Sequence, residues 1–199
     1  PTPTPALTKD VDNNFDSLTA KTMLSVEKTD QDPVTVDGLR MYIGTRTGGA
    51  DATTNVAVET GGVTGNAIAL NSGKFASASR GPRVELITPV IIDDSTVTAE
   101  FKAKLATSNA VLRYNDSTSS ETGTVISGLS TTDWTTIKVE IDNTDGECVR
   151  KMWIGKNETP ILTDAVETLP VLWGTVDNGT SAKVLLDDLK ITTTVKPVE

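Results

Sequence analysis

One stretch decides the fold class of this 199-residue chain, and it reads Thr135-Thr136-Ile137-Lys138-Val139-Glu140-Ile141-Asp142-Asn143-Thr144-Asp145-Gly146. The side chains of Ile137, Val139 and Ile141 fall on one face of an extended chain, whereas Lys138 and Glu140 fall on the other. Such alternation is typical of an antiparallel strand with one face on a core and one in water. The turn residues that follow, with a glycine that can take positive φ, predict a hairpin to the next strand.

Short runs with the same alternation, rich in Val, Ile and Thr and separated by Gly, Asn and Asp, fill the rest of the chain. The best runs are residues 39–46, 67–71, 83–88, 96–106, 110–114, 135–141, 149–154 and 183–193, and the weaker ones are 14–18 and 55–60. Residues 162–169 give a signal for a short helical turn. Strands at this spacing predict a single all-β domain, an antiparallel β-sandwich, and favour it over a barrel without excluding the barrel.

The chain opens on Pro1-Thr2-Pro3-Thr4-Pro5, an alternation that favours extended polyproline II. We therefore interpret residues 1–10 as an N-terminal Pro/Thr linker and residues 11–199 as the β-sandwich domain. An ordinary disordered terminus is the alternative. A linker in this place predicts that the domain is one module of a larger protein.

Composition excludes several classes of partner. The chain has 18 Lys and Arg against 27 Asp and Glu, a formal net charge of -9, so it has no overall attraction for nucleic acid or anionic lipid. No apolar run approaches the roughly 20 residues of a membrane-spanning helix, and no signal segment opens the sequence. The single cysteine, Cys148, cannot form an internal disulfide. We expect a monomer that binds neither nucleic acid nor a membrane.

Catalytic chemistry is restricted as well, because the chain contains no histidine. Ser-His-Asp and Cys-His relays are impossible, as is a zinc site that needs imidazole. Glu140-Ile141-Asp142 resembles the Glu-x-Asp-x-Glu strand of retaining glucanases, but Thr144 stands where their second glutamate would be. We therefore expect no enzyme activity, with a polysaccharide hydrolase, or a lyase that uses Tyr or Lys as its base, as the alternative.

Several segments resemble parts of jelly-roll carbohydrate-binding modules. They are Asn13-Asn14-Phe15-Asp16-Ser17, Gly65-Asn66-Ala67-Ile68-Ala69-Leu70, Ser79-Arg80-Gly81-Pro82-Arg83-Val84 and Leu185-Leu186-Asp187-Asp188-Leu189-Lys190-Ile191. The resemblance implies a jelly-roll sandwich without catalytic activity, appended to an upstream catalytic module of a secreted enzyme that degrades plant cell-wall polysaccharide. Its partner would be that polysaccharide. A laminin-G-like adhesion module, binding protein or glycan, is the alternative.

The last of these segments has a carboxylate where an apolar side chain is expected. If Leu185, Leu189 and Ile191 face the core, Asp187 shares their phase and points inward, where an unpaired carboxylate costs several kcal/mol. A structural calcium ion shared with Asp16 would satisfy it. The resemblance points the same way, because jelly-roll modules often hold calcium between their first and last strands. Hydrogen bonds from backbone amides, or a lysine, are the alternative.

Sugar recognition needs an aromatic ring that stacks on apolar C–H groups, with planar polar groups beside it. In residues 39–46 the apolar side chains share one face, which leaves Arg40, Tyr42 and Arg46 together on the other as a predicted polysaccharide platform. A solvated outer face, with the arginine stems lying on the sheet, is the alternative.

Further arginines of the same half of the chain, Arg80, Arg83 and Arg113, add to this platform. Guanidinium groups bind carboxylates bidentately, so clustered arginine favours a uronic-acid polymer such as pectin. Pairing with the chain's own Asp and Glu is the alternative reading of these arginines.

The other aromatic candidates for sugar binding are Tyr114, Trp153 and Trp173. Trp153 alternates with apolar neighbours and is expected to be exposed, while Trp173 is expected to cap one end of the sandwich or to line a cleft. Structural packing is the alternative for both tryptophans.

Overall fold

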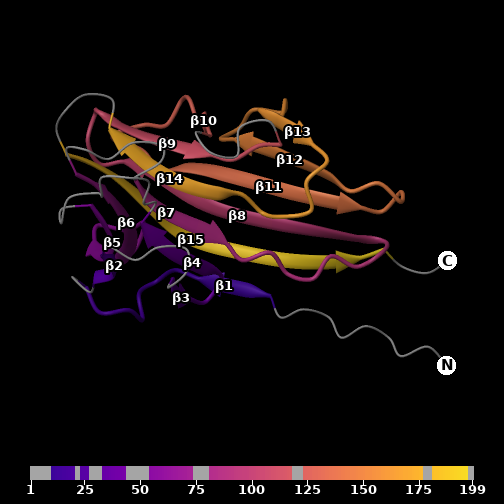
Figure 1. The fold of residues 1–199 in the computed structure, drawn as a ribbon, viewed down its shortest axis with the longest axis horizontal. Helices are drawn as coiled ribbons and strands as arrows, with labels where there is room; N and C mark the ends of the chain where they lie inside the picture. Colours follow the sequence, from indigo (N-terminus) through magenta and orange to yellow (C-terminus); the bar gives the residue numbers. More distant parts are fainter. Residues whose placement is uncertain are drawn as a thin grey trace.

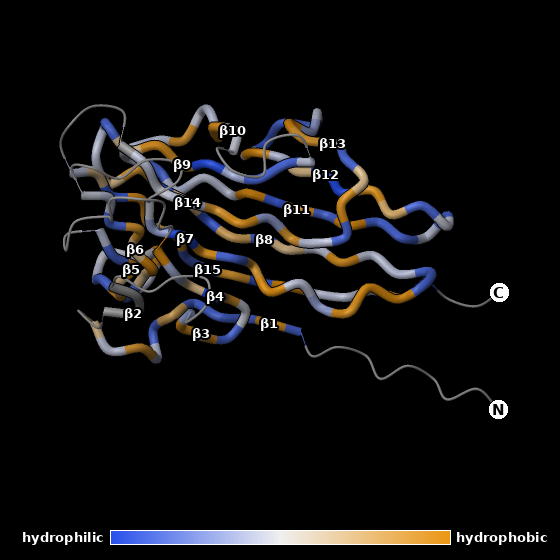
Figure 2. The backbone as a smooth tube through the Cα atoms, viewed as in Figure 1, coloured by the Kyte–Doolittle hydropathy of each residue, from blue (hydrophilic) through white to orange (hydrophobic). Residues whose placement is uncertain are grey.

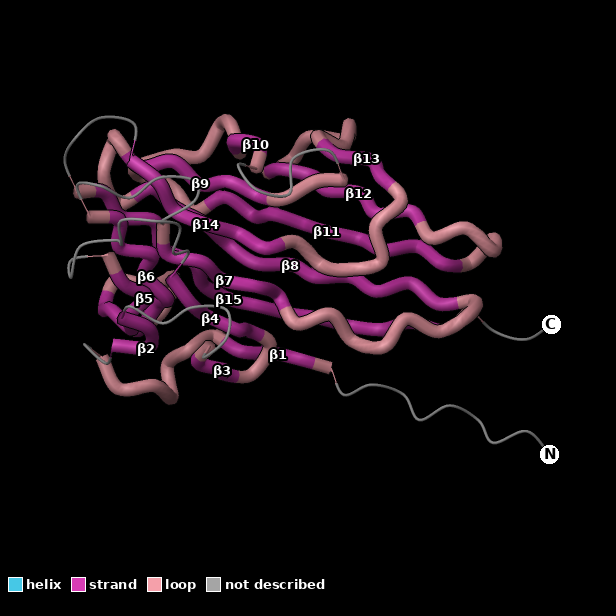
Figure 3. The backbone as a smooth tube through the Cα atoms, in the orientation of Figure 1, coloured by secondary structure: helices cyan, strands magenta, loops and turns pink. Residues whose placement is uncertain are grey.

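The computed structural model describes residues 10–20, 23–26, 33–43, 54–73, 81–117, 123–176 and 181–196. Over these residues the chain forms strands, turns and loops, and none of them is helical (Figure 3). The predicted helical turn at residues 162–169 is wrong, because Leu162 packs into the core and Leu162–Asp164 pairs with a neighbouring strand. Accordingly, no described segment is a helix long and apolar enough to cross a bilayer.

The described strands form two sheets in which every pairing is antiparallel. The nine-stranded sheet has the order β13-β12-β11-β8-β15-β6-β5-β2, and β1 also pairs with β15. Its strands are β1 (Val11–Asn13), β2 (Met23–Val26), β5 (Asn55–Thr60), β6 (Asn66–Ser72), β8 (Ser95–Leu105), β11 (Thr135–Asn143), β12 (Val149–Ile154), β13 (Leu162–Asp164) and β15 (Ala182–Val195). The long strands β8, β11 and β15 run side by side along the molecule (Figure 1).

The six-stranded sheet has the order β10-β9-β14-β7-β4-β3. Its strands are β3 (Val34–Val36), β4 (Leu39–Ile43), β7 (Pro82–Leu86), β9 (Ala110–Tyr114), β10 (Thr124–Val125) and β14 (Val171–Val176). One main hydrophobic cluster takes side chains from both sheets, such as Met41 of β4 and Val139 of β11. Hydrophobic and hydrophilic residues alternate along the strands (Figure 2). The predicted all-β antiparallel sandwich of jelly-roll type is therefore confirmed.

The first strand differs from its prediction. The sequence predicts a strand over residues 14–18, but β1 ends at Asn13 and the chain then turns. Phe15 takes a left-handed backbone conformation, with φ of 59°, and its ring is buried in the main cluster. The Phe15 amide donates to the Asn13 side chain at 2.8 Å, which stabilises this turn.

The last strand, β15, contains a bulge between Asp187 and Lys190, and this bulge changes which residues face the core. Before the bulge Leu186 belongs to the main cluster, whereas Leu185 packs in a small separate cluster on the other face of the sheet. After the bulge Leu189 and Ile191 face the core. The prediction that Leu185 shares a core phase with these two residues is therefore wrong, because one extra residue shifts the alternation.

Candidate functional site

The outer face of the six-stranded sheet holds a row of polar and aromatic side chains that face away from the core. Strand pairing places Tyr42 of β4 opposite Arg83 of β7, Arg83 opposite Trp173 of β14, and Trp173 opposite Arg113 of β9. The core side of the same strands is apolar, with Met41, Val84 and Leu172 in the main cluster. We call the four residues Tyr42, Arg83, Trp173 and Arg113 the arginine–aromatic row.

Within this row the guanidinium groups lie against the rings. The Arg83 guanidinium carbon is 5.1 Å from the centroid of the Trp173 ring and 6.0 Å from that of Tyr42, so it lies between the two. The Arg40 guanidinium contacts the other side of the row, 5.5 Å from the Tyr42 ring centroid. These distances are those of cation–π interactions. Such interactions hold the flexible arginine side chains in one arrangement.

The two rings of the row are buried, which corrects one expectation. Tyr42 faces away from the core as predicted, but it is 7% exposed, and Trp173 is 1% exposed. Neither ring belongs to a hydrophobic core cluster. Burial raises the pKa of the Tyr42 phenol, with the Arg83 charge opposing the shift. The prediction of an open Tyr42 platform is therefore wrong, because strand periodicity fixes the face of a side chain and not what covers it.

Trp173 has an additional feature that its burial makes costly. Its indole Nε1–H is buried and has no hydrogen-bond acceptor among the described residues. The same edge of the indole, next to Nε1, packs against Gly123, where an added Cβ would clash with Cζ2. Leaving a buried donor unsatisfied costs about 1–3 kcal/mol, so such groups are rare in folded proteins. The unsatisfied donor lies in the row between the arginines at 83 and 113.

The two outer arginines of this face are anchored differently. Arg40 forms an ion pair with Glu85 at 2.7 Å, and each side chain is 34% exposed. Arg113 donates from Nε to the Thr175 hydroxyl at 3.3 Å and from a terminal nitrogen to the Gly123 carbonyl at 3.5 Å. Glu85 is the one acidic residue in the described strands of this sheet, so the face is positive within an acidic protein.

Trp153 lies on the other side of the sandwich, on the outer face of the nine-stranded sheet. Met152 and Ile154 are buried beside it in the core, and Trp153 is half-buried. Its Nε1–H donates to the Glu158 carbonyl at 3.2 Å, and the Lys138 ammonium is 5.1 Å from its ring centroid. The predicted phase of Trp153 is confirmed, but the residue is remote from the arginine–aromatic row.

The remaining sequence candidates do not join the row. Tyr114 is buried in the main cluster, on the core face of β9, where burial raises the pKa of its phenol. Its expected role at the binding surface is therefore not supported by its position. Arg46 and Arg80 lie outside the described residues, as does the Pro/Thr segment of residues 1–5.

The two predicted metal ligands, Asp16 and Asp187, both bind the turn between β5 and β6. Asp187 is fully buried, and its carboxylate accepts the Val63 amide at 2.6 Å and the Asp188 amide at 2.7 Å. Asp16 accepts the Asn66 amide at 2.7 Å. Burial raises the pKa of Asp187 to about 6 despite these hydrogen bonds.

The buried carboxylate of Asp187 is thus satisfied by backbone amides, which is the alternative to calcium that the sequence offers. Among the residues the structure describes, no three His, Cys, Asp or Glu side chains are grouped closely enough to hold a metal ion. Calcium at Asp16 and Asp187 stays a prediction.

The carboxylates considered for catalysis have structural contacts. Asp142 accepts both the amide and the hydroxyl of Thr144, at 3.0 and 2.7 Å, and so stabilises the hairpin turn. Glu140 lies 3.7 Å from the Lys138 ammonium. Asp142 and Glu140 are on the outer face of β11, beside the lysines of the nine-stranded sheet.

Comparison with known proteins concerns the fold. No protein-family model matches the chain, and no curated protein sequence matches it. Similar solved structures include an endo-1,3-β-glucanase from Streptomyces sioyaensis, with a TM-score of 0.49 and 9% identity over 98% of this chain and 99% of that one. Another is the CBM22-1 xylan-binding domain from Paenibacillus barcinonensis Xyn10C, with a TM-score of 0.42 and 15% identity over 91% and 100% of the two chains.

Peanut lectin is also similar, with a TM-score of 0.44 and 9% identity over 95% of this chain and 100% of the lectin chain. Likenesses at these identities and scores carry no information on the ligand of this chain. The similar structures thus include an enzyme, a xylan-binding domain and a lectin.

Proposed function

We propose that this chain is a non-catalytic carbohydrate-binding module that binds an acidic plant cell-wall polysaccharide such as pectin. It would do so with the outer face of the six-stranded sheet, as a monomeric part of a secreted modular enzyme whose catalytic module it keeps on the substrate. The observation that carries the proposal is the buried indole N–H of Trp173, without a described acceptor, in a row between Arg83 and Arg113.

The donors of this row suit a carboxylate. A guanidinium group offers paired N–H donors in a plane, and such forks bind carboxylates bidentately. The Trp173 N–H is a neutral donor buried beside them, and it would donate to a carboxylate or hydroxyl oxygen of the ligand once the side chains that cover it move aside. Because the row crosses β4, β7, β14 and β9, a polysaccharide that followed it would lie across the strands.

The stacked rings support binding by fixing the donors in advance. Tyr42 and Trp173 hold the Arg83 side chain between them, so little side-chain entropy is lost when a ligand binds. Burying two large rings outside the hydrophobic core is not needed to join the two sheets. We therefore interpret the rings as a support layer for arginine and not as stacking surfaces for sugar.

Affinity electrophoresis through gels containing polygalacturonate, xylan, glucan or mannan tests this proposal. We expect retardation by polygalacturonate and a loss of roughly 10- to 100-fold in affinity in Arg83→Ala, since a hydrogen bond to a charged group contributes about 1.5–3 kcal/mol. Lys138→Ala, which removes a cation from the opposite outer face, is the matched control and should bind as the wild type does. Retardation by none of the polysaccharides, or equal losses in both variants, would contradict the proposal.

A further inference from the structure

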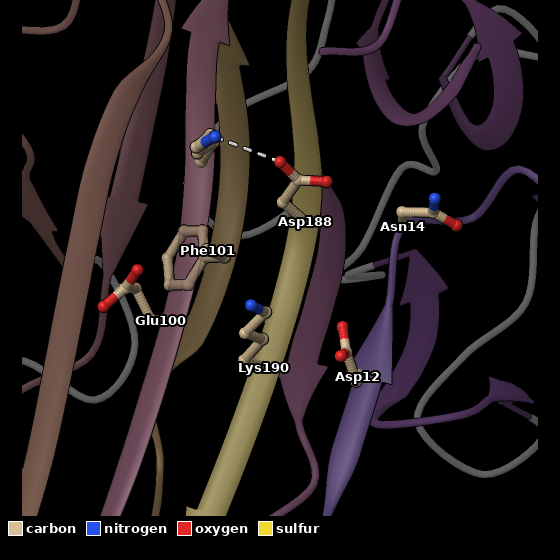
Figure 4. Close-up of a pocket in the computed structure, with 7 residues that line it drawn as sticks. Asp12, Asn14, Glu100, Phe101, Asp188 and Lys190 are labelled. Atoms are coloured by element: carbon tan, nitrogen blue, oxygen red, sulfur yellow. Dashed lines mark hydrogen bonds and ion pairs between the residues drawn. The ribbon is translucent and has the colours of Figure 1, made fainter. Parts of the chain in front are cut away.

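A polar cavity lies on the other side of the sandwich from the arginine–aromatic row, on the outer face of the nine-stranded sheet. It has a volume of about 470 Å³, which falls within the range of small-molecule sites. The polar side chains that line it come from three adjacent strands and the turn after β1, and they are Asp12, Asn14, Glu100, Lys102, Asp188 and Lys190 (Figure 4). None of them belongs to the arginine–aromatic row.

The bulge in β15 builds one wall of this cavity. Asp188 takes a left-handed conformation, with φ of 51°, which is uncommon for a residue other than glycine. The register shift at this position exchanges the side chains that face the core for those that face outward. The Asp188 carboxylate accepts a hydrogen bond from the Lys102 ammonium at 3.1 Å. Bulges of this kind redirect side chains and occur often beside functional sites.

Three charged groups of the cavity have no partner within the described part of the chain. Lys190 lies opposite Asp12 on β1 and opposite Glu100 on β8, and all three side chains are exposed. Cross-strand neighbours of opposite charge commonly pair, yet none of these three forms an ion pair or hydrogen bond with a described residue. Figure 4 shows Lys190 between the strands that carry Glu100 and Asp12, and a dashed line marks the hydrogen bond that the Asp188 carboxylate accepts.

The size and charge of the cavity restrict its ligand. The carboxylates are too dispersed for a metal ion, because the described residues contain no group of three acidic or metal-binding side chains. The strands carrying Asp12 and Glu100 flank β15, so their backbones lie about 10 Å apart, twice the strand spacing. With three carboxylates and two ammonium groups, the lining has a net charge of −1, which disfavours an anion.

We propose that this cavity binds an uncharged sugar residue through its hydroxyl groups. Lys190 would donate to a hydroxyl oxygen, and the carboxylates of Asp12 and Glu100 would accept from hydroxyl groups on either side. The ligand class is therefore a neutral saccharide, in contrast to the uronate expected on the arginine–aromatic row. The inference does not depend on the function proposed for that row.

The test is a titration of the ¹⁵N-labelled protein with D-glucose, D-galactose, D-mannose and D-xylose, followed by two-dimensional NMR. We expect at least one of these sugars to shift the amide signals of Asp12, Glu100 and Lys190, with a Kd on the order of 1 mM or weaker. Lys190→Met keeps the apolar stem and removes the donors, and it should weaken binding at least about 10-fold.

Two variants serve as controls. Lys138→Met changes the next lysine in the same cross-strand row, outside the cavity, and should bind the sugar as the wild type does. Arg83→Ala should also leave this binding unchanged, which separates the cavity from the arginine–aromatic row. The proposal fails if no sugar shifts the three signals, if Lys190→Met binds equally well, or if D-galacturonate binds here more tightly than the neutral sugars.

Discussion

The outer faces of the two sheets carry their positive charge in different forms. In the described strands, every lysine belongs to the nine-stranded sheet, and these are Lys102, Lys104, Lys138, Lys151, Lys183 and Lys190. Apart from Arg150, every arginine of the described strands belongs to the six-stranded sheet. Lys102 and Lys138 contact the acidic side chains of Asp188 and Glu140, and Lys104 and Lys138 each also lie over one tryptophan ring. Arg83, in contrast, is held between two aromatic rings.

This difference follows from the chemistry of the two cations. The lysine ammonium is a compact, strongly hydrated charge on a flexible stem, and it keeps a broad sheet surface soluble. The arginine guanidinium is planar and weakly hydrated, so it stacks on rings and still binds a carboxylate in its plane. The outer face of the six-stranded sheet, whose rings are buried, is therefore better prepared for an acidic ligand than that of the nine-stranded sheet.

The largest expected effect concerns Arg150, the one arginine in the described strands of the nine-stranded sheet. It is fully buried on the core side of β12 and binds Asp164 twice, at 2.8 and 2.9 Å, and the carbonyls of Thr168 and Asn115 at 3.0 Å. Arg150→Met leaves Asp164 buried without its cation, and we expect a loss of about 3–5 kcal/mol in the free energy of unfolding. Urea denaturation measures it.

The matched variant is Arg150→Lys, which keeps the charge and loses the planar set of donors. An ammonium group cannot reach Asp164 and both carbonyls at once, so we expect Arg150→Lys to recover less than half of the lost stability. Wild-type stability in this variant would show that charge alone is needed at this position.

A smaller effect is expected from Asp187, the buried carboxylate of the nine-stranded sheet. Its pKa is about 6 in the folded protein and near 3.9 in an unfolded chain. Between these values the folded state binds the extra proton, so the stability contributed by this group is complete below about pH 4 and is lost as the pH rises through 6. At about 1.4 kcal/mol per pKa unit, the loss is about 2–3 kcal/mol.

Asp187→Asn removes the titration. The unfolding free energy of the wild type minus that of the variant should therefore fall by that amount from pH 4 to pH 7. Any constant cost of the amide cancels in this comparison. The predicted calcium ion is tested in the same measurement, because a bound cation favours the ionised carboxylate and should abolish the slope when calcium is added. A flat difference in the presence of chelator would contradict the raised pKa.

Exchanging the two cations tests the comparison between the faces directly. Arg83→Lys keeps one positive charge but loses the bidentate geometry and the stacking on Trp173. We expect affinity for polygalacturonate to fall by about 10-fold, or about 1.4 kcal/mol, without a comparable loss of stability. Isothermal titration calorimetry measures the affinity. The reverse exchange on the other sheet, Lys138→Arg, should leave affinity unchanged, and a gain there would show that any arginine suffices.

The sequence predicts the fold class well because alternation is a local property. The outward phase of Tyr42 and Trp153 and the inward phase of Ile137 follow from period two alone, and all three are confirmed. The sequence also predicts the burial of Asp187, which is confirmed, but it does so from an alternation that the bulge in β15 interrupts. A bulge depends on pairing with neighbouring strands, which no local pattern encodes.

The arrangement of the candidate site is less accessible to sequence reasoning. Arg83 and Trp173 meet because β7 pairs with β14, and these strands are far apart in the chain. The burial of Tyr42 and Trp173 depends on what covers the sheet, whereas periodicity reports only the face. The polar cavity likewise needs β1, β15 and β8 in register, so Asp12, Glu100 and Lys190 carried no shared signal.

The smallest expected effect is spectroscopic and concerns the tryptophan indole groups of the two faces. Trp173 Nε1–H has no described acceptor, whereas Trp153 Nε1–H already donates to the Glu158 carbonyl. On addition of oligogalacturonates, we expect the indole signal of Trp173 to move downfield in a ¹⁵N–¹H spectrum, because a new acceptor deshields the proton, while the Trp153 signal stays in place. Trp173→Phe and Trp153→Phe assign the two signals. If the Trp173 signal does not respond while binding persists, the row binds its ligand through arginine alone and the unsatisfied donor has another acceptor, such as a buried water.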